Sequence, residues 1–539
     1  MQRWLNVLKL SLLSAGLFVA ACGGGGSGIK GGPGSEILRR GISESPDTVD
    51  PHKVSSQWEN IVVGDMFVGL FTDGPDAAPV LGMAESYEIS EDGLTWTFKL
   101  KDAKWSDGVP VTAYDFEFAF RRILDPATAA EYASLLFLIK NAQPYYEGDV
   151  GEDEFGVRAI DEKTLEIRLE YPAPYLPGLL KHYTSFPVPK HKVEELGDAW
   201  VKPENIVVNG PYKLEEWRTG DFLKSVANPQ WEGSDKLCMK TIYYFPTEDL
   251  DVIERMISRE EIDMNNAFEG QRRDELEQKF PGWVRTMPSL TTTYYVFNNE
   301  NPTFSDKRVR HALAMSLDRD FMVNKVLTAG YEPAYAFVPP GIASYDGGTE
   351  VYWKEWSLEK RLEEAEKLLR QAGYGPDNPL EFTYIYRSTD DNPKVAPVVL
   401  QNWSEIADWV QPQIEMQDTK ILYERLKQAD FEVGDAAWVA DYNDPQNFLF
   451  LLESRTGMMN YGNYNNPEYD RLVNASNLET NIEERKVLLK DAEQLMLDDM
   501  PVIPMWYQVT KNLVDPRLSG FVDNPEDIHR SRYICEAGN

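Results

Sequence analysis

Segments with the hydrophobic pattern of a strand and segments with that of a helix alternate irregularly along this chain. These patterns constrain its fold more than any other feature of the sequence. Apolar and polar residues alternate in 94–100 and in 165–169, which is typical of half-buried strands. After Ser357, leucine and alanine side chains fall on one helical face up to Gly373. No internal repeat accompanies these elements. The 539 residues therefore predict an α/β protein of roughly two to four structural units.

The composition is that of a folded protein with an acidic surface. Hydrophobic residues make up 42% and aromatic residues 12% of the chain, which is enough to fill large cores. The 88 acidic and 54 basic side chains give a formal net charge of −34. Nucleic acid and anionic lipid carry the same sign of charge, so nonspecific contact with either is disfavoured and we predict no nucleic-acid partner. Cationic or amine-bearing ligands suit this charge.

The N-terminus carries an export signal. Two basic residues precede an apolar run over 10–21, which at about a dozen residues is shorter than the roughly 20 that a bilayer span needs. The run ends in two alanines and Cys22, and a glycine-rich stretch follows. This resembles the lipobox of bacterial lipoproteins, which implies a signal peptide over 1–21, lipidation of Cys22 and a tether over 22–35. An ordinary cleavage site with a chance cysteine nearby is the alternative.

Two cysteines remain once Cys22 is lipidated. In an exported, oxidising setting, Cys238 and Cys535 can form a disulfide that pins the C-terminal tail to the segment around Cys238. Two unpaired buried cysteines are the alternative. Residue types and positions alone leave both possibilities open.

Four common motifs of catalysis and metal binding are absent from the sequence. The chain lacks the nucleophile elbow G-x-S-x-G, the zinc motif H-E-x-x-H, the P-loop G-x-x-x-x-G-K-[ST] and paired C-x-x-C. Its five histidines have no histidine partner at helical or short spacing. Among 88 carboxylates an acid pair for glycoside hydrolysis could always be proposed, so such a pair carries no information. We therefore predict a protein that is not an enzyme and needs no cofactor or metal.

One segment whose residues are typical of a turn contains both aromatic residues and carboxylates. Residues 438–445 have the sequence Trp-Val-Ala-Asp-Tyr-Asn-Asp-Pro, with Asp441 near the middle. An aromatic wall beside a buried acid suits the capture of a ligand that bears an ammonium group. From residue types alone, Asp441 is more simply interpreted as a turn or helix-cap aspartate ahead of Pro445.

Several ordered motifs resemble those of one protein family over nearly the whole body of the chain. The most specific follows the predicted strand 94–100 and reads Lys-Trp-Ser-Asp-Gly-Val-Pro-Val-Thr-Ala-Tyr-Asp-Phe in 104–116. The others are Asp-Pro-His in 50–52, Asn-Gly-Pro-Tyr in 209–212, the run 304–313 with Asp318 and Arg319, Ala-Asp-Tyr-Asn-Asp-Pro in 440–445 and Pro-Val-Ile-Pro in 501–504. The chain thus resembles family 5 of the extracellular solute-binding proteins, which serve peptide ABC importers, and within it the oligopeptide-binding branch.

The resemblance implies a two-lobed fold of the periplasmic-binding-protein type (type II, cluster C), with a hinge between the lobes and an additional inserted domain. The implied base lobe is discontinuous, the inserted domain follows its first segment, and the second lobe is a single segment. The implied boundaries are 36–67, 204–290 and 508–539 for the base lobe, 68–203 for the inserted domain and 291–507 for the second lobe. Cys238 and Cys535 then both belong to the base lobe, which makes their pairing more plausible.

The resemblance also implies the binding residues. In family members the aspartate of the 440–445 motif pairs with the peptide α-ammonium group, which gives Asp441 this role. Tyr132 matches a tyrosine that lines the cleft, with a packed core tyrosine as the alternative. The other implied contacts come from both sides of the cleft: Ala437, Trp438 and Val439 opposite Ser55 and Gln57. An isolated tryptophan is more often a core residue than a site residue, so the role of Trp438 rests on the resemblance.

Three positions depart from the family pattern. Asp435 stands where oligopeptide-binding members can carry an arginine that helps to neutralise the ligand carboxylate, so its negative charge would repel that carboxylate. Leu426 and Asn392 occupy positions where such members can offer a basic residue. We therefore expect the amine end of a peptide to be recognised as usual, whereas carboxylate recognition is relocated, weakened or absent.

Three functions remain to be distinguished. The resemblance implies a lipid-anchored, monomeric receptor, exported to the periplasmic space or the cell surface, that delivers oligopeptides to the permease and ATPase subunits of an ABC importer. A receptor of the same fold for another amine-bearing or non-peptide solute is the second. A secreted hydrolase of peptides or glycans is the third, and it would need an acid or nucleophile pair that the sequence does not reveal.

Overall fold

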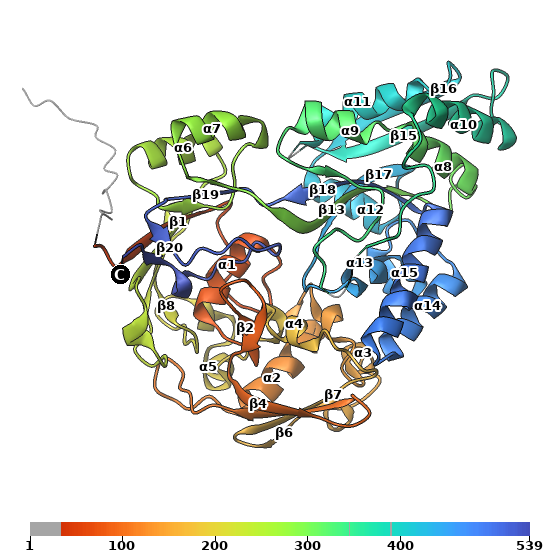
Figure 1. Cartoon of the computed structure of the whole chain (residues 1–539). Helices are drawn as coiled ribbons and strands as arrows, with labels where there is room; N and C mark the ends of the chain where they lie inside the picture. The colour runs from red at the N-terminus through yellow and green to blue at the C-terminus, as the bar shows by residue number, and fades with distance from the viewer. Residues whose placement is uncertain (1–33, 344, 346, 389–390, 539) are drawn as a thin grey trace, which may run out of the picture. The chain divides into compact units, whose positions relative to one another are not determined.

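The computed structural model describes residues 34–343, 345, 347–388 and 391–538 (Figure 1). The predicted signal peptide, the lipidation of Cys22 and the tether up to residue 33 lie outside these residues. None of the helices within them is long and apolar enough to cross a membrane.

A seven-stranded sheet gathers strands from three separate stretches of the chain. β1 lies at its centre, parallel to β10 and β11, and the other neighbouring pairs are antiparallel. In spatial order the strands are β12 (Val284–Arg285), β19 (Asn512–Val514), β11 (Met264–Asn265), β1 (Ile37–Ile42), β10 (Thr241–Pro246), β9 (Phe222–Ala227) and β8 (Tyr212–Arg218). All seven fall in the segments predicted for the base lobe.

A six-stranded sheet is built almost entirely from residues of the predicted second lobe. Only the start of one strand and the end of another lie outside the predicted boundaries of that lobe. β15 is parallel to both of its neighbours, β16 and β17, and the remaining pairs are antiparallel. In spatial order the strands are β14 (Glu332–Pro333), β18 (Val502–Val509), β13 (Pro288–Phe297), β17 (Val433–Val439), β15 (Leu380–Arg387) and β16 (Val410–Gln417). β13, β17 and β18 lie side by side in Figure 1.

An antiparallel four-stranded sheet lies within the predicted inserted domain. Its order is β4 (Ala84–Ile89), β5 (Thr95–Leu100), β7 (Thr164–Arg168) and β6 (Val157–Asp161). Trp96, Phe98 and Leu100 of β5 are buried, so the strand predicted from alternation over 94–100 is confirmed to within one residue. The remaining strands form two short two-stranded sheets. These are β2 (Phe71–Asp73) with β3 (Pro79–Leu81), and β20 (Leu518–Ser519) with β21 (Cys535–Glu536).

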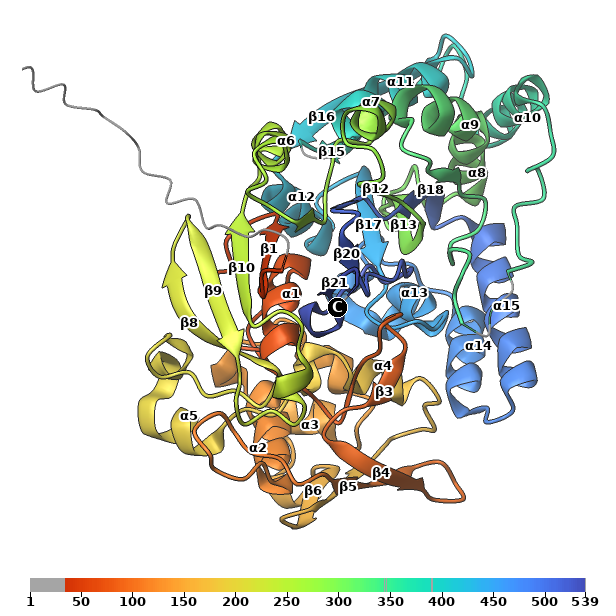
Figure 2. The same ribbon diagram turned by 60° about the vertical axis from the view of Figure 1, so that its left-hand side comes forward.

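Helices occur between the strands throughout the described chain. The helix predicted after Ser357 is confirmed as α10, because the Ser357 side chain accepts a hydrogen bond from the backbone N–H of Lys360 at its start. The helices are α1 (Gln57–Met66), α2 (Ala113–Leu124), α3 (Ala142–Glu147), α4 (Leu176–Leu180), α5 (Lys190–Leu196), α6 (Leu250–Ser258), α7 (Arg273–Lys279), α8 (Lys307–Ser316), α9 (Arg319–Phe321), α10 (Leu358–Gln371), α11 (Asn392–Ser404), α12 (Thr419–Lys427), α13 (Gln446–Leu449), α14 (Pro467–Leu478) and α15 (Ile482–Asp499). α14 and α15 pack side by side (Figure 2).

Buried apolar side chains form two large clusters among the described residues, with a smaller third one beside the seven-stranded sheet. The first cluster takes its members from 290–509. The second joins strands of the seven-stranded sheet, such as β1 and β10, to β5 and β7 of the four-stranded sheet. The predicted inserted domain therefore shares a hydrophobic core with the predicted base lobe, and the domain boundaries themselves stay a prediction.

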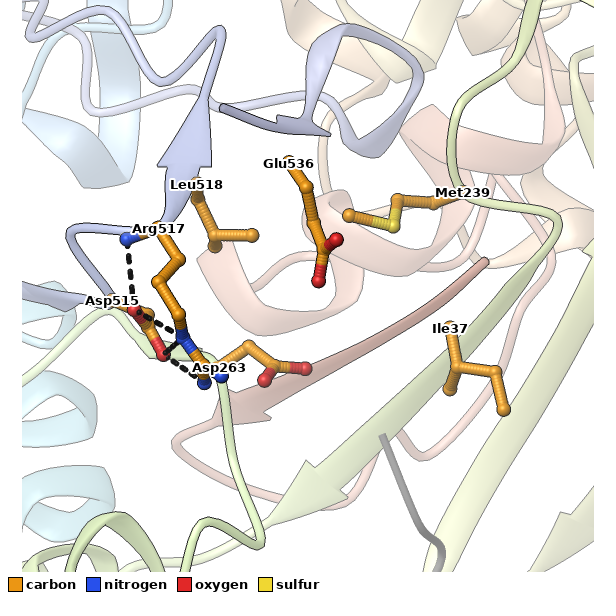
Figure 3. Close-up of a pocket in the computed structure, with 7 residues that line it drawn as sticks. All are labelled: Ile37, Met239, Asp263, Asp515, Arg517, Leu518 and Glu536. Atoms are coloured by element: carbon orange, nitrogen blue, oxygen red, sulfur yellow. Dashed lines mark hydrogen bonds and ion pairs between the residues drawn. The ribbon is translucent and has the colours of Figure 1, made fainter. Parts of the chain in front are cut away.

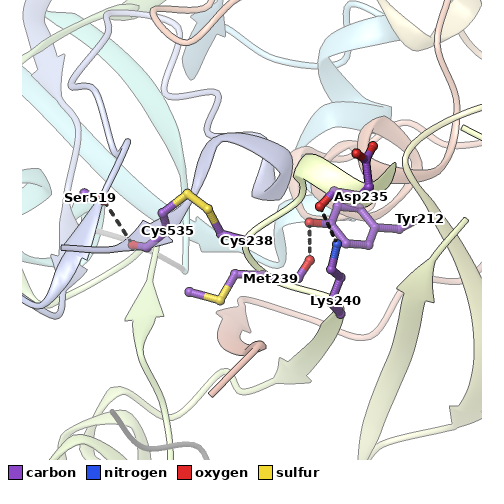
Figure 4. The surroundings of a disulfide bond; sticks show 7 residues. All are labelled: Tyr212, Asp235, Cys238, Met239, Lys240, Ser519 and Cys535. Atoms are coloured by element: carbon purple, nitrogen blue, oxygen red, sulfur yellow. Dashed lines mark hydrogen bonds between the residues drawn. A yellow bond between two sulfur atoms is a disulfide. The ribbon is translucent and has the colours of Figure 1, made fainter. Parts of the chain in front are cut away.

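Cys238 and Cys535 are joined in a disulfide, with their Cα atoms 5.1 Å apart (Figure 4). Cys535 belongs to the short strand β21, and its carbonyl accepts a hydrogen bond from Ser519 Oγ at 3.4 Å. The adjacent Glu536 accepts a hydrogen bond from the backbone N–H of Gly34 at 2.6 Å. The tail is thus attached both to the segment before β10 and to the first described residue of the chain.

Replacing both Cys238 and Cys535 with serine is expected to lower the temperature of unfolding. The disulfide spans a sequence separation of 297 residues, so it restricts the unfolded chain strongly. Native disulfides typically stabilise a protein by about 2–5 kcal/mol. Scanning calorimetry of the oxidised wild type, the reduced wild type and the double variant measures the effect. Equal unfolding temperatures for all three would show that the disulfide contributes no stability.

Candidate functional site

Asp441 lies in a turn that leads from β17 to α13, and one asparagine organises this turn. The Asn447 Oδ1 atom accepts a hydrogen bond from the backbone N–H of Asp441 at 2.9 Å. The same oxygen accepts a hydrogen bond from Trp438 Nε1 at 3.0 Å. Asn447 therefore fixes the position of Asp441 relative to the Trp438 indole, whose ring also contacts Phe450 edge-on at 5.8 Å.

The Asp441 side chain is half-buried, and no basic side chain of the described chain pairs with it. Its Oδ2 atom is buried and has no hydrogen-bond partner among the described residues. Burial raises the pKa of the Asp441 carboxyl to about 7, and the Asn447 side chain offsets part of this rise. No basic side chain of the described chain contributes to that pKa. A positively charged ligand group placed here would supply the missing partner.

Two tyrosines face Asp441 from the predicted inserted domain. Tyr132 and Tyr183 contact each other edge-on, with ring centroids 6.0 Å apart. Burial is the main cause of the raised pKa of both phenols, and the charge of Asp441 contributes to each. The structure thus brings the predicted residue Tyr132 together with Asp441, and Tyr132 is partly exposed. Tyr183 was missed because no motif or spacing distinguishes it from the chain's other tyrosines.

A stacked pair of tyrosines joins the same two parts of the chain next to Asp441. The rings of Tyr175 and Tyr442 are nearly parallel, at 7°, with centroids 5.1 Å apart. The Arg485 guanidinium lies 5.6 Å from the centre of the Tyr175 ring and donates two hydrogen bonds of 2.8 Å to the Asp444 carboxylate. Sequence reasoning missed Tyr175 and Arg485, because α4 and α15 are far apart along the chain.

Strand β17 has an edge that is only partly covered. Along one side it pairs with β13 from Val433 to Val439, whereas β15 pairs with it only at Val433 and Gly434. The predicted site residues Ala437, Trp438 and Val439 lie beyond this short contact, and the Val439 side chain is 54% exposed. An extended segment of another chain could add to this edge by backbone hydrogen bonds.

Ser55 and Gln57 are exposed at the start of α1. The backbone N–H of Ser55 donates to Glu59 Oε2 at 3.0 Å, and Ser56 caps the helix in a capping box with Glu59. The charge of Glu59 acts on Tyr183, which places the start of α1 on the Tyr183 side of the site. That Ser55 and Gln57 face Ala437 to Val439 stays a prediction.

The interpretation of Asp435 as a bare negative charge is wrong. Its side chain is fully buried, and its Oδ2 atom accepts a hydrogen bond of 2.7 Å from Arg387 Nε. β15 and β17 are parallel neighbours, so Arg387 at the end of β15 lies beside Asp435 in β17. Because the two opposite charges form an ion pair, Asp435 does not present an uncompensated charge to a ligand carboxylate.

Leu426 is fully buried in the hydrophobic core, and its effect on specificity stays a prediction. It packs so tightly against Gly434 of β17 that a Cβ atom at Gly434 would lie 2.5 Å from Leu426 Cδ2. Asn392 is buried at the first position of α11. A role for Asn392 in ligand recognition stays a prediction.

Two cavities of the described structure are lined by residues other than the predicted site residues. One of about 10 Å³, lined by Ile37, Met239, Asp263, Asp515, Arg517, Leu518 and Glu536, has room for about one water (Figure 3). A surface groove of about 450 Å³ is lined by residues such as Glu300, Lys427, Met458 and Asn463. Within the described residues, no three histidine, cysteine or acidic side chains gather as a metal site would require.

Comparison with known proteins identifies the family. Residues 78–460 match the profile described as bacterial extracellular solute-binding proteins, family 5 (middle). The chain belongs to this family. As a whole this solute-binding protein is 36% identical to the periplasmic oligopeptide-binding protein OppA of Escherichia coli, over 98% of its own length and 99% of that relative.

Solved structures share the fold of this solute-binding protein. The murein tripeptide binding protein MppA of Escherichia coli matches it with a TM-score of 0.83 at 33% identity, covering 93% of this chain and 98% of that one. OppA of Haemophilus influenzae in complex with RPPGFSPFR matches with a TM-score of 0.82 at 32% identity, covering 93% and 99%. The predicted fold class, an α/β protein of the two-lobed periplasmic-binding-protein type, is confirmed, and the family is one of solute-binding proteins rather than enzymes.

Proposed function

We propose that this solute-binding protein captures peptides by their free α-ammonium group and delivers them to the permease and ATPase subunits of an ABC importer. The observation that carries the proposal is Asp441, a half-buried carboxylate whose Oδ2 atom is buried and which has no basic partner among the described residues. A ligand ammonium group would supply the missing charge. Because Asp441 is partly buried, this pairing would be stronger than the same pairing in bulk solvent.

The partly covered edge of β17 supports recognition of the groups that all peptides share. A ligand whose ammonium group lies at Asp441 can run along Ala437 to Val439 and pair its backbone N–H and C=O groups as an added strand. Affinity then depends little on ligand side chains, which can occupy hydrated pockets at low cost. Peptides of differing sequence would therefore be accepted.

The names of the similar proteins agree with a peptide ligand. The Escherichia coli relatives are named for oligopeptides and for a murein tripeptide, and the Haemophilus influenzae structure holds a peptide. The sequence motif at Cys22 supports a lipid-anchored, exported form of this protein. Mass spectrometry of the purified mature protein, expected to show a diacylated or triacylated Cys22, tests the anchor separately from the ligand.

The ion pair of Asp435 with Arg387 changes what we propose for the carboxylate end of the ligand. The pair carries no net charge, so it neither repels nor strongly attracts a carboxylate. Recognition of the carboxylate would then depend on chain length and on other groups. A peptide and its C-terminal amide are therefore expected to bind with similar affinity.

The function is tested by identifying the ligand and then removing its amine. Mass spectrometry of molecules released from the purified protein is expected to show peptides. Calorimetry with one such peptide and its N-acetylated form is expected to show much weaker binding of the acetylated form, because acetylation removes the positive charge. Equal binding of both forms would contradict ammonium recognition, and turnover of the peptide by the pure protein would point to a hydrolase instead.

Peptide binding is expected to weaken in acid because of Asp441. Its pKa in the ligand-free protein is about 7, so the carboxyl group is increasingly protonated below that pH and must lose its proton to pair with an ammonium group. Affinity should fall by about tenfold for each pH unit below 7. Above about pH 8 it should fall again as the α-amino group, with a pKa of about 7.7–8.0, loses its charge. Calorimetry from pH 5 to 9 measures this profile, and a flat profile would contradict it.

A further inference from the structure

The chain passes from one hydrophobic core to the other at Asp441. Trp438 and Ala440 pack against the first large cluster, whose buried members lie in 290–509. Tyr442 belongs instead to the second cluster, which joins the seven-stranded sheet to the four-stranded sheet. Among the described residues of 290–509, Tyr442 is the one member of that second cluster. A side chain of the predicted second lobe is thus part of the core of the other two predicted parts.

Tyr175 and helix α4, which follows it, form the seat of the Tyr442 ring. Tyr442 is only 4% exposed, and its ring stacks on that of Tyr175 with centroids 5.1 Å apart. A Cβ atom added at Gly178, in the middle of α4, would lie 3.2 Å from the Tyr442 Cβ atom. α4 and α13, which lies shortly after Tyr442, are neighbours in Figures 1 and 2. Glycine at 178 therefore permits a close approach that a larger side chain would obstruct.

The turn that carries Tyr442 is held by groups of its own part of the chain. The backbone N–H of Asp444 donates to the Tyr442 carbonyl at 2.9 Å, and Arg485 donates two hydrogen bonds to the Asp444 carboxylate. The Tyr442 hydroxyl donates to Gln446 Oε1. None of these three bonds has to break when the ring leaves its seat. Ring stacking, burial and the Arg485 guanidinium near the Tyr175 ring make the contact itself, and such contacts can form and break as lobes move.

We propose that Tyr442 is a positioning residue for ligand capture, whose ring occupies the seat on Tyr175 and α4 when the lobes close over a ligand and leaves it when they open. Asp441 precedes the ring directly, so a seated ring also holds this carboxylate beside the predicted inserted domain. The inference rests on the proposed function, because a captured ligand is what favours the closed arrangement. The apparent affinity of any ligand then depends on the fraction of the protein that can close.

The substitution Gly178→Leu tests the seat from the side of α4. Its side chain would take the space of the Tyr442 ring, so affinity for a free-amine peptide should fall by about tenfold or more. Affinity for the N-acetylated peptide should fall by the same factor, because closure and not ammonium recognition is impaired. Gly151→Leu is the matched control, since a Cβ atom at Gly151 meets nothing within 4 Å, and it should bind both peptides as the wild type does. Calorimetry measures all four affinities.

Small-angle X-ray scattering supplies a readout that a merely structural role would not move. The wild type and Gly151→Leu are expected to become more compact when saturated with peptide. Gly178→Leu is expected to keep a larger radius of gyration at saturation, because its lobes cannot close fully. Equal compaction of Gly178→Leu and the wild type would overturn the proposal.

A double-mutant cycle tests whether the ring and its seat act as one contact. Tyr442→Ala removes the ring and should lower both affinities by about tenfold, whereas Tyr442→Phe keeps the ring and should retain most of the affinity. In the Tyr442→Ala background, Gly178→Leu should cost much less than in the wild type, because its side chain no longer meets a ring. Additive losses, or an equal loss in Tyr442→Phe and Tyr442→Ala, would overturn the proposal.

The remaining outcomes distinguish this inference from the proposed function. If the wild type prefers the free-amine peptide but Gly178→Leu and Tyr442→Ala bind as the wild type does, the closing role is overturned and the proposed function stands. If the wild type binds both peptides equally, ammonium recognition is overturned, and losses specific to Gly178→Leu would still support the closing contact. If the wild type binds neither peptide, both are overturned. Should Gly178→Leu or Tyr442→Ala fail to fold, Gly178→Ala is measured instead; a smaller loss shared by both peptides is expected, and wild-type affinity would overturn the inference.

Discussion

Replacing Asp441 with asparagine is expected to weaken the binding of a free-amine peptide by about 30-fold or more, the largest loss of affinity that we expect from a single substitution. Removing one partner of a buried, hydrogen-bonded charge pair typically costs 2–5 kcal/mol or more, and about 1.4 kcal/mol is a factor of ten. The asparagine keeps the size of the side chain, so the loss would reflect charge. Calorimetry at pH 7.5 measures it.

The same substitution should leave the fold intact or stabilise it. Burial of the Asp441 carboxylate without a cation is costly, as its raised pKa indicates, and asparagine removes that cost. An unchanged or higher unfolding temperature together with lost affinity would mark Asp441 as a functional residue. Asp430→Asn serves as control, since that carboxylate is 72% exposed and should affect neither property. Retained affinity in Asp441→Asn would show that the ammonium group binds elsewhere.

The substitution Lys181→Met is expected to cause the largest loss of stability. Lys181 Nζ lies 3.1 Å from Asp73 Oδ1 and 2.5 Å from Glu526 Oε2, and all three side chains are buried. Although burial opposes it, the charges of Arg530 and Lys181 lower the pKa of Asp73 to about 2. Without Lys181, Arg530 would still pair with Asp73, but Glu526 would lose its ion pair with Lys181. Breaking a buried ion pair in this way costs about 3–5 kcal/mol.

A lower unfolding temperature in scanning calorimetry checks this prediction. Lys367→Met is the matched control, because Lys367 is 59% exposed in its pair with Glu364, and such surface pairs contribute about 0–1 kcal/mol. We expect the control to unfold near the wild-type temperature. Similar unfolding temperatures for Lys181→Met and the wild type would mean that the buried network contributes little net stability. The network matters because it links α4 and β2 to the C-terminal segment.

Local patterns were sufficient to predict individual elements. β5 follows from the alternation of Trp96, Phe98 and Leu100, and the start of α10 follows from Ser357. Both depend on residues within a few positions of each other. The motif around Asp441 predicts a site residue from one continuous segment that holds the strand and the turn after it, and the role of Asp441 in binding stays a proposal.

Pairing between distant residues could not be predicted in the same way. The sequence left open whether Cys238 and Cys535 are bonded, and they are 297 positions apart. The negative charge of Asp435 was expected to repel a ligand carboxylate. Its partner Arg387, which lies 48 positions earlier in the sequence, could not be identified from the sequence. The adjacency of β15 and β17, which creates this ion pair, has no signature in either strand.

The sequence by itself determined the α/β class, the acidic character of the chain and the motif that contains Asp441, and it predicted the export signal. Each of these depends on composition or on a short continuous pattern. Only the tertiary structure decided which charges are compensated. It leaves the half-buried Asp441 without a basic partner among the described residues, while it pairs Asp435 with Arg387. Two aspartates six positions apart thus differ in chemistry, because ion pairing depends on the neighbours that folding brings close and not on the neighbours along the chain.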